Sequence, residues 1–360
     1  MSRRKSFFSG LLAVLFVAGA PVINICGETD IFGETALDDS EIHGNVARIT
    51  ASAAEREFYV GGMPAGFTLG VGGAQVIGLT QVMGETGSFS PAAKAGLKTG
   101  DVIERVSGVR VRTTAELNDA IGRCGGKEVT LYIRRHGETA EVAVRPVKDK
   151  VTGRYKIGIL ARDNVSGIGT VTYIEKDSRK FGSLGHPVAA ENGGEFSGGD
   201  ICSCCIVGIK KGVRGKAGEL RGTFLNAEKI GKGEKITDCG IFGVFSETYC
   251  LTGNLTAYAA TADEVNIGNA CIYSTIEGDT PKKYEIDIVK VDKNNRGNKN
   301  FVIKITDDEL LEKTGGIVQG MSGSPILQNG KLVGAVTHVF INDPTRGYGV
   351  SIDTMLKSAE

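Results

Sequence analysis

The chain has 360 residues, which is enough for two or three domains, and its 52 glycines, 8 prolines and lack of tryptophan are typical of a turn-rich β protein. Lysine plus arginine and aspartate plus glutamate each number 42, so the formal net charge is zero. This balance gives no general electrostatic reason for nucleic-acid binding. One local basic cluster, at Lys210, Lys211, Arg214 and Lys216, is expected to be solvated loop surface.

The N-terminal segment has the pattern of an export signal. Basic residues at positions 3–5 precede an apolar run over residues 7–25. Small residues at positions 18–20 resemble a cleavage site, but Pro21 follows directly, and proline there disfavours cleavage because it fixes the backbone and lacks an N–H. We therefore predict that residues 1–26 form a membrane anchor, with a cleaved signal as the alternative, and that the rest of the chain lies outside the cytoplasm.

A polar, mixed segment at residues 27–60 is predicted to be a spacer, and residues 61–148 are predicted to form a compact α+β module. The most specific part of this module is the run S-P-A-A-K-A-G-L-K-T-G-D-V-I at residues 90–103. In this run a proline opens a short helix, a glycine ends it, and a Gly-Asp pair turns the chain into a strand. The module is similar to PDZ domains of the kind found in bacterial proteases.

PDZ domains bind an extended peptide by adding it as a strand to the edge of a sheet. The resemblance places the loop that binds the peptide carboxylate at Leu69, Gly70 and Val71, before a candidate strand. A peptide ligand is therefore an expected partner of this module.

The remaining residues, 149–360, consist of short β patterns separated by glycine turns, for example at residues 169–174 and 283–289. Helical periodicity is convincing only at residues 308–313 and 352–359. The size and pattern of this region predict a pair of six-stranded antiparallel barrels. The predicted fold is thus mostly β, with a double β-barrel domain preceded by the α+β PDZ module and the anchor.

The most informative motif is G-M-S-G-S-P at residues 320–325, followed by the strand-like run K-L-V-G-A-V-T. A serine held between glycines in a tight turn exposes its hydroxyl, and the amides of Gly320 and Ser322 are predicted to hold an oxyanion. The pair of features resembles the nucleophile loop and substrate-binding strand of chymotrypsin-like proteases, although Met321 stands where those enzymes carry an acid. A Gly/Ser hairpin in another β protein is the alternative interpretation.

A nucleophilic serine needs a base, and histidine is the usual choice. His43 lies in the spacer and His136 in the PDZ module, which leaves His186 and His338. His186 is flanked by a glycine in a turn after a strand, and its distance from Ser322 along the chain lets the two come from different barrels. We predict that His186 is the base.

His338 follows the strand after the nucleophile turn. In the chymotrypsin-like resemblance this strand lines the specificity pocket, so Thr337, His338 and Val339 are predicted to contact substrate. An ordinary structural histidine is the alternative for His338.

The third member of a triad holds the imidazole in one tautomer and stabilises its charge. Chymotrypsin-like enzymes place this aspartate between the histidine and the serine, and Asp238 fits that order. Asp307 and Asp308 lie closer to the serine, and Asp343 follows His338. The residues alone leave these candidates open.

Several specific motifs follow one another along the chain. After the anchor and the PDZ module come F-G-S-L-G-H at residues 181–186, T-G-G-I-V-Q-G-M-S-G-S-P at residues 314–325 and A-V-T-H-V-F-I-N-D-P-T-R-G-Y-G-V at residues 335–350. This combination resembles the stage IV sporulation protein B family of serine peptidases. The resemblance implies a triad of His186, Asp307 and Ser322, with Asp307 in the family's I-T-D context.

The resemblance also implies a function. Members of the family are exported from the forespore into the space between two membranes, and they cleave themselves. They then cut the extracytoplasmic segment of a membrane protein that inhibits an intramembrane protease, which releases the processing of a late sporulation sigma factor. Two alternatives are a general exported quality-control protease with a PDZ domain and a non-enzymatic PDZ adaptor. No cofactor is predicted.

Eight cysteines are present, but their crowding at Cys202, Cys204 and Cys205 does not predict a disulfide framework. Cys202 and Cys205 form one C-x-x-C without a second such pair or a closely spaced histidine pair, so a metal site is not predicted. Free, buried thiols in a strand are expected instead.

Overall fold

The structure is a computed structural model that describes residues 56–186, 188, 198–295 and 297–360, apart from the side chains of residues 226 and 227. The predicted anchor at residues 1–26 and most of the predicted spacer lie outside the described residues. No helix within the described ranges is long and apolar enough to cross a membrane. The prediction of a mostly β chain is confirmed, since strands far outweigh the helices α2 to α5.

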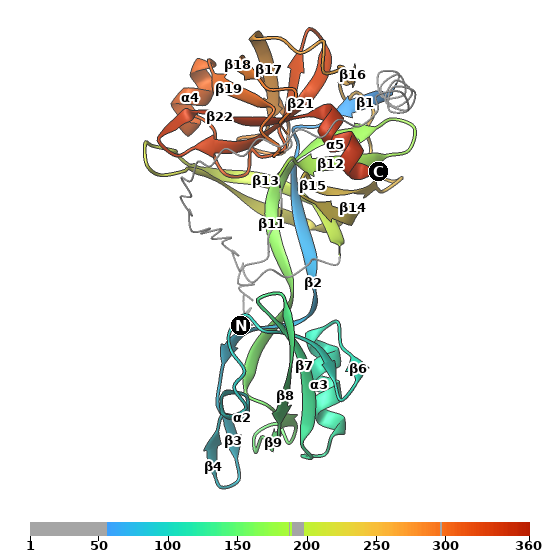
Figure 1. Ribbon diagram of the computed structural model, residues 1–360, viewed down its shortest axis with the longest axis vertical. Helices are drawn as coiled ribbons and strands as arrows, with labels where there is room; N and C mark the ends of the chain where they lie inside the picture. The colour runs from blue at the N-terminus through green and yellow to red at the C-terminus, as the bar shows by residue number, and fades with distance from the viewer. Residues whose placement is uncertain (1–55, 187, 189–197, 296) are drawn as a thin grey trace, which may run out of the picture. The chain divides into compact units, whose positions relative to one another are not determined.

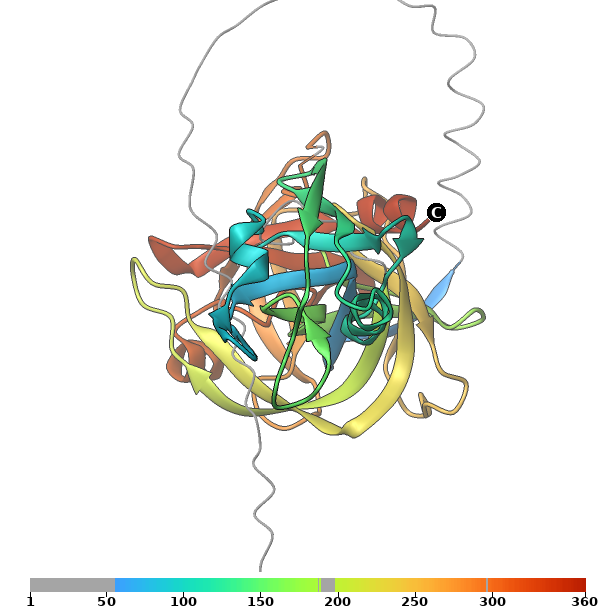
Figure 2. The same ribbon diagram turned by 90° about the horizontal axis from the view of Figure 1, so that it is seen from below.

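The first β unit is a ring of antiparallel strands (Figure 1). In ring order its strands are β11 (Ile159–Glu175), β12 (Lys180–Leu184), β15 (Gly240–Phe245), β14 (Glu219–Thr237), β13 (Gly199–Lys210) and β2 (Pro64–Leu79). The ring closes because β2 pairs with both β13 and β11. Figure 2 shows β13 and β14, in yellow-green and yellow, curving around one side of this unit. Phe67, Phe181, Ile201 and Phe245 are buried in its core.

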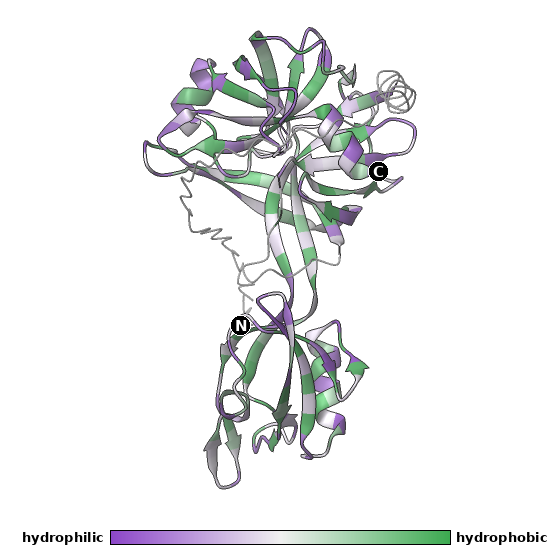
Figure 3. Ribbon diagram, in the orientation of Figure 1, coloured by the Kyte–Doolittle hydropathy of each residue, from purple (hydrophilic) through white to green (hydrophobic). Residues whose placement is uncertain are grey.

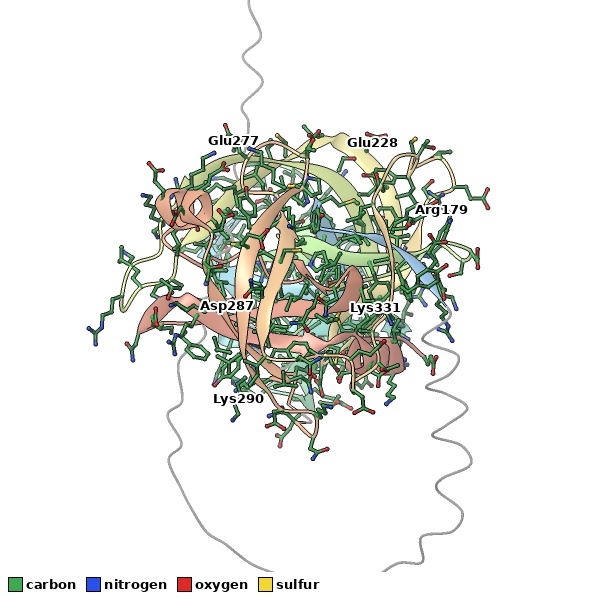
Figure 4. All side chains as sticks on the ribbon, turned by 90° about the horizontal axis from the view of Figure 1, so that it is seen from above. Arg179, Glu228, Glu277, Asp287, Lys290 and Lys331 are labelled. Carbon is green, nitrogen blue, oxygen red and sulfur yellow. The ribbon has the colours of Figure 1, made fainter. Side chains whose placement is uncertain are left out.

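The second β unit is a closed barrel of six strands. They are β17 (Gly268–Ser274), β18 (Lys282–Val291), β19 (Phe301–Ile305), β22 (Asp343–Ser351), β21 (Lys331–Phe340) and β20 (Pro325–Gln328). Alternate side chains such as Ile272, Ile286 and Ile303 fill the interior, as strand geometry requires. Asp287 and Lys290 lie at the outside of β18 (Figure 4). The two predicted helices are confirmed as α4 (Asp308–Thr314) and α5 (Ile352–Ala359).

The PDZ module follows the predicted local signals. Its elements are β3 (Val82–Gly84), β4 (Gly87–Phe89), α2 (Pro91–Lys94), β5 (Val102–Val106), β6 (Val109–Arg110), α3 (Thr114–Arg123), β7 (Val129–Arg135), β8 (Glu138–Val144), β9 (Val147–Lys148) and β10 (Tyr155–Lys156). Gly96 follows α2 with φ +83°, and the Thr113 side chain caps α3 by accepting a hydrogen bond from the Glu116 amide at 3.1 Å. Figure 3 shows hydrophobic segments concentrated in the strands, with hydrophilic segments in the loops and on α3 and α4.

The strand pairing does not follow a linear division of the chain into spacer, PDZ module and peptidase. Residues 57–60, assigned above to the spacer, form β1 (Glu57–Val60), which pairs with β11 and with β16 (Thr256–Tyr258). The first half of β2 pairs with β13 of the first ring, whereas Ala74 and Gln75 pair with β5 of the PDZ module. The PDZ module is therefore inserted into the first ring between β2 and β11. These two strands pair from Pro64 opposite Thr170 to Leu79 opposite Ile159.

The thiols are described for seven of the eight cysteines, since Cys26 lies outside the described residues. Every cysteine in the described ranges is free, including Cys202 and Cys204, which are buried in β13. Burial raises the pKa of the Cys204 thiol to about 12, so this thiol is protonated and unreactive at neutral pH.

Candidate active site

The nucleophile turn at residues 320–323 leads directly into β20 and depends on two glycines. Gly320 and Gly323 have φ values of +100° and +95°, a region that side-chain-bearing residues rarely adopt. A Cβ on Gly323 would also clash with the carbonyl oxygen of Thr170. The Ser322 hydroxyl, half-buried in this turn, donates a hydrogen bond to the Thr337 carbonyl oxygen at 2.8 Å.

The backbone amides of the turn divide into two groups. Those of Met321, Gly323 and Ser324 donate hydrogen bonds to backbone carbonyls of the second barrel unit at 3.1, 2.8 and 3.0 Å. For the amides of Gly320 and Ser322 there is no hydrogen bond to any residue that the structure describes. These two amides are the ones that the sequence analysis assigned to the oxyanion, and they remain available to a ligand.

His186 lies in a turn after β12 that rests against the second barrel. Gly185, with φ +66°, approaches β21 so closely that an added Cβ would lie 3.0 Å from Thr337 Cγ2. The rings of His186 and His338 have centroids 5.2 Å apart and are tilted by 46°. The structure thus brings His186, His338 and the strand that contacts Ser322 into one place, although they come from both barrels.

His338 is in an unusual electrostatic position. Partial desolvation of its ring, followed by the nearby His186 and Lys299, lowers the pKa of His338 to about 4. His338 is therefore neutral at pH 7. A neutral neighbour does not oppose the positive charge that His186 would acquire on taking a proton.

The pairing of β21 with β22 is interrupted at Thr337 and His338, which are two of the predicted substrate-contacting residues. Val336 pairs with Gly349 and Val339 with Gly347, and the register shifts between these pairs. Such a bulge frees backbone groups from the ladder at Thr337 and His338. Thr337 is buried, whereas His338 is exposed and Val339 partly exposed. The last two side chains can therefore contact a peptide.

Asp307 is the N-cap of α4. Its Oδ1 accepts a hydrogen bond from the Leu310 amide at 2.9 Å, and its Oδ2 accepts one from the Glu285 amide at 3.3 Å. Both carboxylate oxygens thus have backbone partners in the second barrel unit. This is the arrangement expected of a helix cap.

Asp238 lies in the hairpin between β14 and β15. Gly240, at the end of this hairpin, pairs with Leu184, and a Cβ on it would lie 3.1 Å from the Gly185 amide nitrogen. The hairpin is therefore adjacent to the turn that carries His186. The Asp238 residue is exposed, and its carbonyl accepts a hydrogen bond from Asn298 Nδ2 at 2.5 Å.

Asp343, the remaining candidate acid, has local partners. Its carboxylate accepts a hydrogen bond from the Thr345 hydroxyl at 2.6 Å and lies 3.5 Å from the Arg346 guanidinium. The Thr345 hydroxyl is the main reason that the pKa of Asp343 is lowered.

The predicted carboxylate-binding loop of the PDZ module is corrected by the structure. Leu69, Gly70 and Val71 lie in the middle of β2, where Leu69 pairs with both β11 and β13 and Gly70 pairs with β11. The Gly70 amide donates a hydrogen bond to the Gly198 carbonyl at 2.9 Å, and Leu69 is buried in the core of the first ring. Because the Gly70 amide is already hydrogen-bonded within the sheet, this segment is not free to bind a peptide carboxylate.

A different sheet edge of the PDZ module is open. Residues 159–162 of β11 pair with β2 on one side, the register shifts at Asp163, and no strand in the described ranges pairs with the other side of this segment. Helix α3 lies along this segment, since the Thr114 amide donates to Asp163 Oδ2 at 3.0 Å. Ile159 and Ala161 pack on the PDZ core, as does Ala120 of α3. An I-G-I-L run at residues 157–160 was the available signal, but the sequence analysis ended the module at residue 148.

Comparison with known proteins now identifies the family. The family model described as SpoIVB peptidase S55 matches residues 153–356, which includes the nucleophile turn and the His186 turn. The chain belongs to the SpoIVB peptidase S55 family. The family match supports serine-peptidase activity. A PDZ-domain model also matches residues 87–135.

Two individual proteins are similar over part of their length. A putative zinc metalloprotease, LL2128, from Lactococcus lactis subsp. lactis (strain IL1403) is 31% identical over 116 residues, which is 31% of this chain and 26% of that protein. The chain thus matches about a quarter of the length of this relative. The crystal structure of the Rv3671c protease in an inactive form is 14% identical, with a TM-score of 0.31, over 53% of this chain and 82% of that one.

Proposed function

We propose that this SpoIVB-family peptidase is an endopeptidase in which Ser322 is the nucleophile, His186 is the base and the amides of Gly320 and Ser322 form the oxyanion hole. The observation that carries this proposal is the backbone of the nucleophile turn: the Gly320 and Ser322 amides have no hydrogen bond to any described residue, while those of Met321, Gly323 and Ser324 are hydrogen-bonded. The two six-stranded rings that supply these groups support a chymotrypsin-like arrangement.

The proposed reaction is acyl transfer in two steps. The Ser322 hydroxyl releases its bond to the Thr337 carbonyl, passes its proton to His186, and attacks the carbonyl carbon of the scissile peptide bond. The negative oxygen that forms is held by the Gly320 and Ser322 amides. The C–N bond then breaks as His186 returns the proton to the leaving amine. Water repeats the sequence on the acyl-enzyme and releases the second product.

Two aspartates compete for the role of orienting His186. We propose Asp307 because it stands in the position of the family's aspartate, although in this structure it caps α4. Asp238 is the alternative, and its support is the adjacency of its hairpin to Gly185. The two assignments make opposite predictions for two single variants, which are described in the Discussion.

For the physiological role, we propose that the peptidase cleaves itself and then the extracytoplasmic segment of a membrane regulator of an intramembrane protease. Membership in the SpoIVB family supports this proposal, and so does the export-type N-terminal segment. The site of action would be outside the cytoplasm, at the forespore membrane. The PDZ module would receive a peptide at residues 159–163, by adding a strand to the open edge of β11.

The test of this role is cleavage in cells. The full chain and its Ser322→Ala form would be co-expressed with candidate membrane regulators, and the new N-termini of the fragments would be sequenced. We expect fragments of the chain itself and of one regulator only with the wild-type serine. Fragments that are identical with both forms would refute the proposed role.

A further inference from the structure

Five consecutive peptide groups, from 319–320 to 323–324, surround the nucleophile. The two that carry the Gly320 and Ser322 amides have their carbonyls, those of Gln319 and Met321, engaged by the amides of Leu220 and Ser324 at 2.8 and 3.0 Å. The other three have their amides bonded within the second barrel unit. What holds the carbonyls of these three groups decides how rigid the oxyanion hole is.

All three carbonyls accept hydrogen bonds from one strand of the first ring. Thr170 Oγ1 donates to the Gly320 carbonyl at 2.7 Å, and the Thr170 amide donates to the Ser322 carbonyl at 3.2 Å. Thr172 Oγ1 donates to the Gly323 carbonyl at 2.8 Å. With these bonds the carbonyl of every peptide group in the turn accepts a hydrogen bond. In the three groups that carry the Met321, Gly323 and Ser324 amides, the N–H is hydrogen-bonded as well.

The two threonines are buried at the junction of the two β units. Thr170 is 2% exposed and Thr172 is fully buried, and both hydroxyls reach carbonyls of the nucleophile turn although the pairing of β11 with β12 shifts its register at Thr172. Val171 between them packs in the core of the first ring. Valine would pack in a buried strand as well as threonine does, but only threonine provides a hydroxyl donor.

We propose that Thr170 and Thr172 are positioning residues that aim the Gly320 and Ser322 amides at the developing oxyanion: Thr170 fixes the peptide groups on both sides of the one that carries the Ser322 amide, and Thr172 fixes the following group of the same turn. Neither threonine touches the substrate. Their effect is on the geometry of the oxyanion hole, where misplacement by about 1 Å can cost on the order of 10²-fold in rate. The inference rests on the proposed role of Ser322.

The test compares valine and serine at each position in the full chain. Thr170→Val and Thr172→Val keep the shape of the side chain and remove the donor, whereas Thr170→Ser and Thr172→Ser keep the donor. The measurement is the rate constant for fluorophosphonate labelling of Ser322 against pH, together with the thermal unfolding temperature. Thr275→Val is the matched control, because Thr275 is also buried and its hydroxyl donates to a glycine carbonyl, that of Gly62, at 2.9 Å.

We expect each valine variant to lower the plateau labelling rate by about 10-fold or more, below the 10²- to 10³-fold loss for removing an oxyanion donor outright. The pH midpoint should not move, since the base is unchanged, and the serine variants should restore the rate. The control should lose stability without losing rate. Folded valine variants that label at the wild-type rate would overturn the proposal, and so would serine variants as slow as valine. If a valine variant does not fold, the serine variant and the other position decide by the same criteria.

Failure of the proposed function is distinguishable from failure of this inference. Wild-type chain that does not label at Ser322 contradicts the assignment of the nucleophile. Wild-type chain that labels normally, with valine variants that label equally well, contradicts only the role of the threonines.

Discussion

The two ends of β11 have different surroundings. Around Thr170 and Thr172 the strand is paired on both edges, with β12 on one side and β1 and β2 on the other, and its hydroxyls hold the nucleophile turn. At residues 159–163 only one edge is paired, and α3 lies alongside. The two ends therefore suit different proposed roles: one supports the proposed nucleophile turn, and the other leaves a strand edge unpaired among the described residues.

If the barrel end of β11 supports the chemistry, the largest effects should come from Ser322→Ala and His186→Ala. Each should lower self-cleavage by at least ~10⁴-fold, and the double variant should be no worse, because the two residues act as a unit. The measurement is the rate of self-cleavage by gel analysis. An active His186→Ala with an inactive His338→Ala would mean that the two histidines have exchanged roles.

The acid should have the next largest effect. Asp307→Asn is expected to lower self-cleavage by about 10⁴-fold if the side chain orients His186, because the amide favours the wrong tautomer. If Asp307 only caps α4, the same variant keeps its rate and nearly all of its stability, because asparagine caps helices about as well as aspartate. Thermal unfolding and self-cleavage of the same preparation separate the two results, and Asp238→Asn is the paired variant. A normal rate in Asp307→Asn with a large loss in Asp238→Asn would assign the role to the hairpin beside Gly185.

A substitution beside the unpaired edge of β11 at residues 159–163 should impair cleavage of the membrane substrate without changing the reactivity of Ser322. Ala120→Arg places a large charged side chain on α3, the helix that lies along this segment of β11 and packs with it on the PDZ core. We expect about a 10-fold loss in cleavage of the membrane substrate, because binding is separable from acyl transfer, with no change in fluorophosphonate labelling. Asp119→Arg, at an exposed position on the same helix, is the control. A folded Ala120→Arg variant that no longer labels would show that the two ends of β11 are not independent.

The smallest effect concerns His338 and pH. Because the folded state lowers the pKa of His338 to about 4, the unfolded chain binds this proton more readily. The contribution of His338 to stability is therefore present above the unfolded pKa of about 6.5 and is lost as pH falls toward 4. His338→Gln should show a smaller fall in unfolding temperature between pH 7.5 and pH 5 than the wild type. Equal falls in the two proteins would contradict the lowered pKa, and His136→Gln is the control.

The local parts of this molecule could be predicted from the sequence, and the long-range parts could not. The nucleophile turn is specified by Gly320 and Gly323, whose φ values few other residues adopt, and the short helix α2 by its proline and Gly96. The insertion of the PDZ module was missed because β1 and the start of β2 pair with strands more than a hundred residues away. The error at Leu69, Gly70 and Val71 has the same cause, since a glycine-containing strand resembles a loop until its partners are known.

The sequence does not separate the two candidate acids, for a related reason. A triad aspartate is defined by its distance from an imidazole, and neither spacing nor the I-T-D context measures that distance. Asp307 also precedes a helix, where aspartate is common as a cap, so one sequence pattern fits both roles. Asp238 has no local motif, and only the pairing of Leu184 with Gly240 brings its hairpin close to the base.

The central claim is that Ser322, in a turn where the Gly320 and Ser322 amides have no hydrogen bond to the described residues, is the reactive group of this peptidase. The most direct measurement is mass-spectrometric mapping of the residue labelled by a fluorophosphonate in the purified full chain, with Ser322→Ala and Ser324→Ala as the paired variants. Ser324 is a suitable comparison because it is buried two residues away and its hydroxyl bonds to Ser274 at 3.0 Å. We predict a single adduct on Ser322 that is lost in Ser322→Ala and retained in Ser324→Ala. An adduct on Ser324, or labelling that survives in Ser322→Ala, would contradict the claim.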